Sequence, residues 1–391
     1  MQHKPLNGIR ILELGGYISA PYASSLMCAL GAEVVKVERP GTGEDFRRHK
    51  NDRSPYFIQY NAGKRSLAVD LKKPEGVALV KALVPRFDVV LENLRAGKLA
   101  SLGLGQTECA ALRPDLVYAS VTGFGNGGPF AQRPAYDTMG QSVGGLYSLL
   151  GDAGTPQLTG TILADLVTGL STATGVLAAL IGRAASGAGQ HMETSIMEAV
   201  STITADAVSQ YFDDGHQDPT RQSRHPQAQN FCLKSATGED FAIHLSSQQK
   251  FWHCLVEALD RRDLADDPRF ATYPDRERNY FELVEIVEAE FLTRPAREWE
   301  KRLTEADVPF APVLTVSGYI NHPQTEWLEL VEPEHNGVSL LRPPWRFGGS
   351  RPEREGVAPR VGQHTREIAG EVYDDSRIDE LVAAGVLFTD S

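Results

Sequence analysis

Short apolar runs alternate with amphipathic stretches through the first part of the chain. Five of these runs have the length of a buried strand, at residues 9–14, 33–38, 66–70, 87–92 and 116–121. Helical patterns separate them, first at residues 21–30 and later after residues 74–76. Strands that alternate with short helices favour right-handed β-α-β units on one sheet. The pattern predicts a large α/β domain with a mainly parallel sheet.

The hydrophobic pattern then becomes helical and afterwards polar. Residues 165–183 predict a long apolar helix, residues 191–195 a strand, and residues 197–212 a second helix. Residues 213–230 are polar and contain Gly, His, Pro, Arg and Gln, which is typical of a linker. The linker therefore separates two regions with different patterns of hydrophobic and polar residues.

A smaller α+β domain is predicted beyond the linker. It has a short strand at residues 241–245 and amphipathic helices at 249–259, 279–292 and 295–306. The end of the chain, with a final helix near 375–385, returns to α/β texture. We therefore expect residues 1–212 to form the first part of the large domain, 213–224 a linker, 225–320 the small domain, and 321–391 a return segment that completes the large domain.

One stretch resembles a membrane span. Residues 166–182 are nearly free of charge. They are short for a bilayer, which requires about 20 apolar residues, and they are rich in Gly and Ala. Small residues at this density favour a helix packed inside a protein, so no membrane association is expected.

Charge and cysteine content narrow the range of partners. The 391 residues carry a formal net charge of -12, which argues against nucleic acid but leaves room for a phosphorylated small molecule. The cysteines, Cys28, Cys109, Cys232 and Cys254, have no metal-ligand or redox spacing. Because a strand pattern begins within a few residues of Met1, we expect no targeting peptide and a cytoplasmic location.

Basic loops follow several of the predicted strands. The turn at residues 14–21 lacks the glycine pattern of dinucleotide-binding folds. Arg39 follows the second strand and precedes flexible glycines, and basic, mostly glycine-bearing loops lie at residues 61–66, 70–73 and 93–98. Carboxyl ends of parallel strands share one sheet edge, so these loops can form a cradle for an anionic nucleotide. Each loop taken singly is more often an exposed surface loop.

Asp165 is the most informative acid in the chain. It immediately precedes an apolar helix with no other charge until Arg183. Asp is a favoured N-cap, which is a sufficient structural explanation. The same position would stabilise an anion and keep the carboxylate ionised, as a nucleophilic carboxylate requires.

Two further features leave alternatives open. The glycine-rich loop at residues 123–129 can open a cleft or supply N–H groups to an oxyanion, or it can be a surface connection. The histidines His225, His244 and His253 are not at metal spacing and are interpreted as structural.

Several segments in this order resemble class III coenzyme A-transferases, the CaiB/BaiF family of formyl-CoA transferase and carnitine CoA-transferase. The matching segments lie at residues 5–14, 31–41, 61–66, 92–97 and 187–190. The resemblance covers essentially the whole chain. It implies a large Rossmann-like domain, a smaller α+β domain and an interlocked homodimer.

The resemblance also implies the site. The family's nucleophilic aspartate falls on Asp165. The positions that match the family's coenzyme A contacts are Ile18, Ser19, Arg39, Val69, Asp70, Leu71, Lys72, Asn93, Leu94, Arg95 and Tyr136. Coenzyme A and acyl-CoA would be substrates together with small carboxylic acids, and neither a metal nor a nucleoside triphosphate would be required. The resemblance also suggests that the donor acid is a small dicarboxylate such as succinate.

The mechanism that the resemblance implies is a series of acyl exchanges. Asp165 attacks the donor thioester and forms a mixed anhydride, and the released thiolate then gives an aspartyl-CoA thioester. An acceptor carboxylate repeats these steps in reverse. The protein must exclude water and stabilise the developing oxyanion.

The chain departs from the family pattern in three places. We find no counterpart of the tetraglycine loop of formyl-CoA transferases between residues 230 and 251, which puts oxalate or formate in doubt. A family arginine that contacts a CoA phosphate falls on Ser101, so Arg95 or Lys98 would substitute. An active-site glutamine falls on Ile18.

Two other functions compete with this one. The α-methylacyl-CoA racemases share the fold and the aspartate but use a His-Asp pair, where this chain has Tyr136 and Asp137. A phenol with a pKa of about 10 is a poor base at neutral pH. A non-catalytic CoA-binding protein would keep the basic loops without needing Asp165. The retained Asp165 and the missing histidine favour the transferase.

Overall fold

The computed structural model describes residues 4–48, 54–152, 154–247, 249–332, 334 and 337–390. The chain divides into two compact units. The first consists of Met1–Tyr147, Leu158–Val208 and Gln324–Ser391, and the second of Ser148–Gln157 and Ser209–Pro323. The hydrophobic pattern had placed residues 148–157 in the large domain. In the structure Arg221 forms an ion pair with Asp152, which attaches that segment to the second unit.

A seven-stranded sheet forms the centre of the first unit, with the strand order β10-β3-β2-β1-β4-β5-β6. Its strands are β1 Arg10–Leu14, β2 Glu33–Glu38, β3 Arg65–Val69, β4 Val89–Glu92, β5 Val117–Thr122, β6 Gln190–Ser195 and β10 Leu387–Phe388. All pairs are parallel except β10 with β3. The predicted α/β class with a mainly parallel sheet is confirmed. Because β1 lies between β2 and β4, the strand order reverses there, where open α/β sheets bind ligands.

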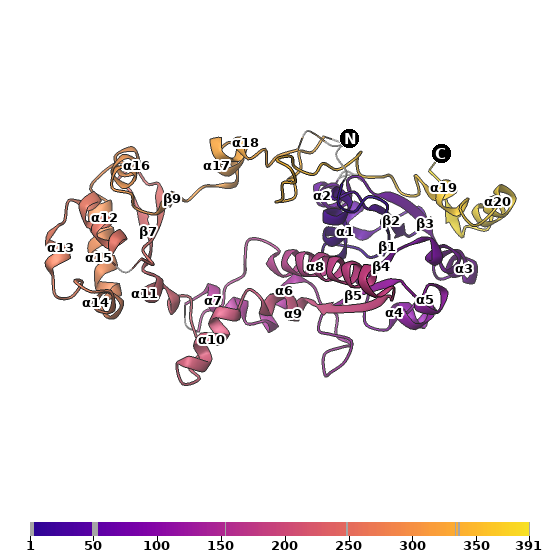
Figure 1. The fold of residues 1–391 in the computed structure, drawn as a ribbon, viewed down its shortest axis with the longest axis horizontal. Coiled ribbons are helices and arrows are strands. Elements are labelled where there is room, and N and C mark those ends of the chain that lie inside the picture. The colour runs from indigo at the N-terminus through magenta and orange to yellow at the C-terminus, as the bar shows by residue number, and fades with distance from the viewer. Residues whose placement is uncertain are drawn as a thin grey trace. The chain divides into compact units, whose positions relative to one another are not determined.

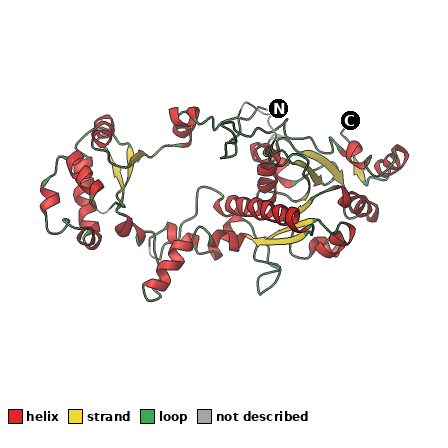
Figure 2. Ribbon diagram, in the orientation of Figure 1, coloured by secondary structure: helices red, strands yellow, loops and turns green. Residues whose placement is uncertain are grey.

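Helices cover both faces of this sheet (Figures 1 and 2). Helices α1 Ser19–Ala29 and α8 Leu163–Ser186 enclose one apolar core. The opposite core is enclosed by α3 Pro74–Leu83, α5 Gln106–Leu112, α19 Thr365–Ala369 and α20 Asp375–Ala383. The return segment at the end of the chain therefore supplies two helices and an edge strand to the large unit.

Several further short helices lie elsewhere along the chain. They are η1 Asp45–Arg48, α2 Pro55–Asn61, η2 Val84–Arg86, α4 Lys98–Ser101, α6 Asp137–Val143, α7 Leu146–Leu150, α9 Ile196–Ser201, α10 Ala205–Asp213, α17 Val316–Ile320 and α18 Pro323–Trp327. The predicted single helix at 197–212 is wrong, since α9 and α10 are separated by a turn. Hydroxyls of Ser201 and Thr202 donate to backbone carbonyl oxygens at this point, and such bonds compete with a continuing helix.

Helix α8 begins earlier than predicted. Its first residue is Leu163, so Asp165 lies in the first turn and is not the N-cap. The apolar residues before Asp165 extend the helix by most of a turn. The helix is long and apolar enough to meet the criteria for a membrane span, but half of its most apolar window is buried in the first unit.

Close packing of α8 on α1 depends on Gly169. A Cβ added there would lie 2.7 Å from the Tyr22 ring and 3.0 Å from the Ser19 carbonyl oxygen. Only glycine allows the two helices to approach this closely. The approach brings Asp165, one turn earlier, next to the start of α1.

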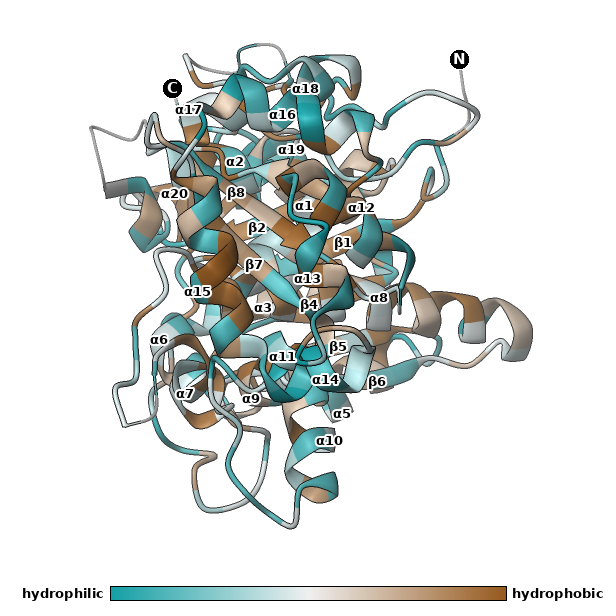
Figure 3. Cartoon of the chain, turned by 90° about the vertical axis from the view of Figure 1, so that its left-hand side faces the viewer, coloured by the Kyte–Doolittle hydropathy of each residue, from teal (hydrophilic) through white to brown (hydrophobic). Residues whose placement is uncertain are grey.

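The second unit packs helices on one face of a small antiparallel sheet. Its strands are β7 Asn230–Lys234, β8 Asp240–His244 and β9 Phe310–Pro312, in the order β7-β8-β9. Its helices are α11 Arg224–Ala228, α12 Lys250–Leu259, α13 Asp263–Asp266, α14 Tyr273–Arg278, α15 Tyr280–Phe291 and α16 Ala296–Glu305. Phe291 and Trp299 stack at 4.2 Å in its core. Figure 3 shows the apolar residues along α15 in brown.

A buried ion cluster connects three strands of the large sheet. The Glu13 carboxylate lies 2.7 Å from the ammonium groups of both Lys36 and Lys64. Lys36 also donates to the Gly15 carbonyl oxygen, and Lys64 to that of Pro21. Burial opposes ionisation of Glu13, but the two ammonium charges outweigh it and lower its pKa to about 2. The cluster therefore fixes the turn between β1 and α1.

Replacement of the central carboxylate should destabilise the large unit. Glu13→Gln removes the buried counter-charge of Lys64 and leaves Lys36 to pair with Glu44 at 3.4 Å, and breaking a buried pair typically costs about 3–5 kcal/mol. We expect a clearly lower urea midpoint of unfolding, followed by circular dichroism. Asp240→Asn breaks the exposed pair with Lys234 and is the control, with an expected effect of roughly 0–1 kcal/mol. Equal midpoints for the two variants would contradict this role of Glu13.

Candidate active site

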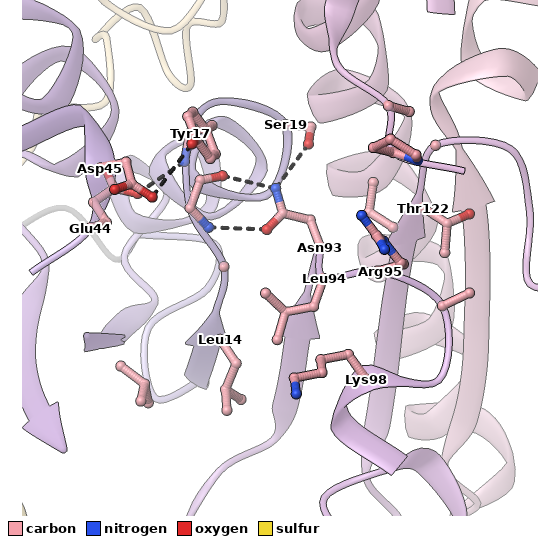
Figure 4. Close-up of a pocket in the computed structure, with 18 of the residues that line it drawn as sticks. Leu14, Tyr17, Ser19, Glu44, Asp45, Asn93, Leu94, Arg95, Lys98 and Thr122 are labelled. Atoms are coloured by element: carbon pink, nitrogen blue, oxygen red, sulfur yellow. Dashed lines mark hydrogen bonds between the residues drawn. The ribbon is translucent and has the colours of Figure 1, made fainter. Parts of the chain in front are cut away.

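A cleft of about 560 Å³ lies in the large unit, at the carboxyl ends of its strands. Its walls come from the segments that follow β1, β2, β3, β4 and β5, and from Asp165 in α8. Figure 4 shows part of the lining, including Tyr17, Asn93 and Lys98. This is the point where the strand order reverses between β1 and β4. The sequence had predicted an anion cradle at this edge.

Most of the predicted site residues line this one cleft. They are Ser19, Arg39, Val69, Asp70, Leu71, Lys72, Asn93, Leu94, Arg95, Tyr136 and Asp165. Ile18 is buried beneath the start of α1 and is not part of the lining. The loop at residues 61–66 does not contribute the basic groups that we expected. Lys64 is buried against Glu13, and Arg65 pairs with Glu33 and Glu367.

Asn93 joins the two segments that meet at the reversal point. Its side-chain oxygen accepts from the Gly16 amide at 3.0 Å, and its amide group donates to the Gly16 carbonyl and the Ser19 hydroxyl. Figure 4 shows these bonds as dashed lines. A Cβ at Gly15 would lie 2.8 Å from the Asn93 side-chain oxygen, so the close approach requires glycine.

Tyr17 is a cleft residue that the sequence did not reveal. Its backbone is left-handed, with φ at 61°, which is unfavourable for a residue with a side chain. The amide donates to the Glu44 carboxylate at 2.9 Å, and the ring packs on those of Phe46 and Tyr136. Only tertiary contacts hold Tyr17 in this conformation, so no local pattern could have identified it.

Several basic side chains line the cleft, and they differ in whether an acid pairs with them. Arg39 pairs with Asp45 at 2.9 Å. Within the described ranges, the structure gives Lys72, Arg95 and Lys98 no acidic partner, although all three line the cleft. Arg95 and Lys98 are the residues expected to substitute for the arginine missing at Ser101. Unpaired cations around a concave site attract a polyanion.

The glycine-rich loop contributes to the same cleft. Gly123 is part of the lining, and the Gly125 amide donates to the Thr122 hydroxyl at 2.8 Å. Arg133, which the sequence did not single out, lies over the Phe130 ring and also lines the cleft. The loop thus forms part of the cleft. This agrees with the predicted role at a cleft and differs from a role as a surface connection only.

Asp165 is the acid of the site. Its residue surface is 8% exposed, and its backbone amide donates to the Asp137 carboxylate at 3.1 Å. We expected the helix terminus to keep Asp165 ionised. Instead burial, together with the negative charge of Asp137, raises the pKa of Asp165 to about 7. The group is therefore poised to exist in both forms near neutrality, which is common for reactive carboxylates.

The buried phenol of Tyr60 and the half-buried phenol of Tyr22 lie near this acid. Burial, the neighbouring Tyr22 and the charge of Asp165 raise the pKa of Tyr60 to about 12. The rings of Tyr22 and Tyr60 meet edge to face at 5.6 Å. Both phenols keep their protons at neutral pH, since burial also raises the pKa of Tyr22. Neither residue was identified from the sequence, because only the packing of α2 against α1 brings Tyr60 here.

The described residues contain no cluster of three or more His, Cys, Asp or Glu side chains arranged to hold a metal ion. His225 and His244 instead line a separate hollow of about 710 Å³ in the second unit. These two histidines therefore belong to a different hollow from Asp165, which lines the large cleft.

Comparison of the chain with known protein families indicates the kind of enzyme to which this cleft belongs. The model of CoA-transferase family III matches residues 6–365. The chain belongs to this family. The resemblance predicted from the sequence is confirmed, and the protein is a CoA-transferase.

Relatives of known activity are similar along nearly their whole length. The succinyl-CoA:glutarate CoA-transferase of Mus musculus is 30% identical, over 98% of this chain and 90% of its own. The succinyl-CoA–D-citramalate CoA-transferase of Chloroflexus aurantiacus is 32% identical, over 93% of each chain. A crystal structure of a CaiB/BaiF family protein from Brucella suis has a TM-score of 0.83 and 33% identity, and covers 95% of this chain and 100% of that one.

Loss of an unpaired cation should weaken CoA binding by this family III enzyme. A hydrogen bond to a charged group contributes about 1.5–3 kcal/mol, so Lys98→Ala should raise the dissociation constant of CoA roughly tenfold or more, with a smaller effect at high salt. Isothermal titration calorimetry measures this directly. Arg262→Ala, an exposed cation of the second unit, is the control. Unchanged CoA affinity in Lys98→Ala would contradict the role of this edge of the cleft.

Proposed function

We propose that the enzyme transfers CoA from succinyl-CoA to a second small carboxylic acid through covalent intermediates on Asp165. The observation that carries this proposal is the position of the Asp165 carboxyl group. It is largely buried, has a raised pKa, and lines the same cleft as the unpaired cations. A carboxylate nucleophile needs access to the thioester and shielding from water, and this position offers both.

The first half of the reaction forms two intermediates. An Asp165 carboxylate oxygen attacks the thioester carbonyl carbon, the C–S bond breaks, and CoA leaves as the thiolate while an aspartyl-acyl anhydride forms. The thiolate then attacks the Asp165 carbonyl carbon, the anhydride C–O bond breaks, and the donor acid leaves as its carboxylate. Asp165 now carries CoA as a thioester. No net proton is consumed.

The second half reverses these steps with a new acid. The acceptor carboxylate attacks the aspartyl-CoA thioester, giving a second anhydride and free thiolate. Attack of the thiolate on the acceptor's carbonyl carbon releases the acceptor as its CoA thioester and restores the Asp165 carboxylate.

Coenzyme A is proposed to lie along the cleft with its anionic end toward the free cations. The contacts expected from the family, apart from the buried Ile18, line the cleft and support this placement. Succinyl-CoA is proposed as donor because relatives from Mus musculus and Chloroflexus aurantiacus are named for it. A small dicarboxylate as acceptor fits the same names.

We also propose an interlocked homodimer located in the cytoplasm. Large apolar side chains are exposed on α8 and α9 of the first unit, among them Leu170, Ile181 and Met197. Exposed apolar surface of this kind can mark interaction sites. The charge of -12 and the unpaired cysteines fit a reducing compartment.

Asp165→Asn should separate binding from turnover. The amide is nearly isosteric but cannot form the anhydride, so CoA exchange should fall by at least about a thousandfold, as expected for loss of a covalent nucleophile. The affinity for free CoA should stay within a few fold. The assay uses a panel of acyl-CoA donors and carboxylic acids, with product CoA thioesters separated by liquid chromatography. Substantial exchange by the variant would refute the proposal.

The pH dependence of catalysis should report the Asp165 carboxyl group. Because only the carboxylate attacks, kcat/KM should rise with pH and level off above a pKa of about 7. Below that value it should fall about tenfold for each pH unit. Asp137→Asn preserves an oxygen acceptor for the Asp165 amide but removes its charge, so the profile should move to lower pH. A profile flat from pH 5 to 8 would count against this assignment.

A further inference from the structure

Glu92 is a buried acid that the proposed chemistry does not use. It is the last residue of β4, is 8% exposed, and does not line the cleft. No ion pair to a cation is formed by Glu92 within the part of the chain that the structure describes. Glu13 at the end of β1 has two lysines, so the two buried acids differ sharply in their surroundings.

The Glu92 carboxyl group instead binds the segment that follows it. One oxygen accepts from the Leu94 amide at 2.8 Å. Burial raises the pKa of Glu92 to about 7, although the Leu94 amide and the Ser120 hydroxyl each oppose that rise by hydrogen bonding to the ionised form. Ser120 lies opposite Glu92 on the neighbouring strand β5.

The contacts continue across the same face of the sheet. The Ser120 hydroxyl lies 3.1 Å from Nε2 of His191 on β6, and His191 is 30% exposed at its side chain. Glu92, Ser120 and His191 thus form a row of polar groups from the cleft edge toward solvent. The Ser120 hydroxyl is uncharged, so it does not neutralise the buried Glu92 carboxyl group.

Stability alone does not favour an acid at this position. A buried carboxyl group without a cation is costly, and an apolar side chain of similar size would pack there at lower cost. A buried acid that has no cation and lies beside a binding site is best explained by a role in function. What Glu92 holds in place is the backbone of Leu94 and Arg95, both of which line the cleft.

We propose that Glu92 is a positioning residue for CoA: its carboxyl group fixes the Leu94 amide and thereby presents Arg95 and Lys98 to the anionic end of the substrate. The inference rests on the proposed CoA cleft. It assigns a role to Glu92, which precedes the loop at residues 93–98. The residues of that loop that line the cleft keep the roles already described. Glu92 acts on affinity and takes no part in the acyl exchange.

Glu92→Leu and Glu92→Gln test this role as a pair. Leucine fills the space but leaves the Leu94 amide without an acceptor, so the dissociation constant of free CoA should rise about tenfold. The KM for acyl-CoA should rise in parallel, whereas kcat and the KM for the acceptor acid should stay within about twofold. Glutamine keeps an oxygen acceptor and should restore CoA affinity to within about threefold of the parent. Glu300→Leu, on an exposed helix position, is the control.

A merely structural role would give a different result. It predicts a lower urea midpoint for Glu92→Leu with no selective change in the KM for acyl-CoA, and that outcome would overturn the inference. Glu92→Met replaces Glu92→Leu if the branched side chain is not accommodated. If neither apolar variant folds, Glu92 is structural and the inference fails. Asp165→Asn distinguishes the two proposals, because it should abolish turnover while free CoA still binds and still responds to Glu92→Leu.

Discussion

The buried carboxylate of Glu13 is the interaction on which the geometry of the active-site cleft depends. It pairs with Lys36 on β2 and with Lys64 just before β3, and Lys36 in turn donates to the Gly15 carbonyl oxygen. The turn after β1 therefore has a fixed position relative to the next two strands. Asn93, which follows β4, binds Gly16 and Ser19 and so fixes the same turn relative to the strand on its other side. The parallel sheet places the carboxyl ends of its strands at one edge. These bonds then fix the loops at that edge so that they form a defined cleft.

Three of the buried acids in this region differ in the groups that compensate their charge. Glu13 has two cations and a pKa of about 2, so it is a permanent anion and a structural element. Glu92 has only hydrogen-bond donors, and Asp165 has an acid, Asp137, as its charged neighbour. Both of these have a pKa of about 7. The environment, more than the residue type, thus separates an acid that supports the fold from one that can become a nucleophile.

Much of this arrangement could be predicted from the sequence, and the exceptions have physical reasons. Strands β1 to β5 were predicted because each is an apolar run buried on both faces of a parallel sheet. The edge strand β10 was missed because its two residues carry no periodic signal. Asp165 was taken as an N-cap because the apolar residues before it are compatible with a loop or with a helix. The family resemblance, more than any local pattern, selected Asp165 and the CoA contacts. Tyr17, Tyr60 and Arg133 were missed because only tertiary packing brings them to the site.

Trapping of the acylated enzyme tests the central claim most directly. The protein is incubated with succinyl-CoA, treated with hydroxylamine, digested and examined by mass spectrometry. The account predicts a hydroxamate on Asp165, formed from either the anhydride or the aspartyl-CoA thioester, and none on Asp137 or in Asp165→Asn. An unmodified Asp165 in an enzyme that turns over under the same conditions, or a hydroxamate on another residue, would contradict it.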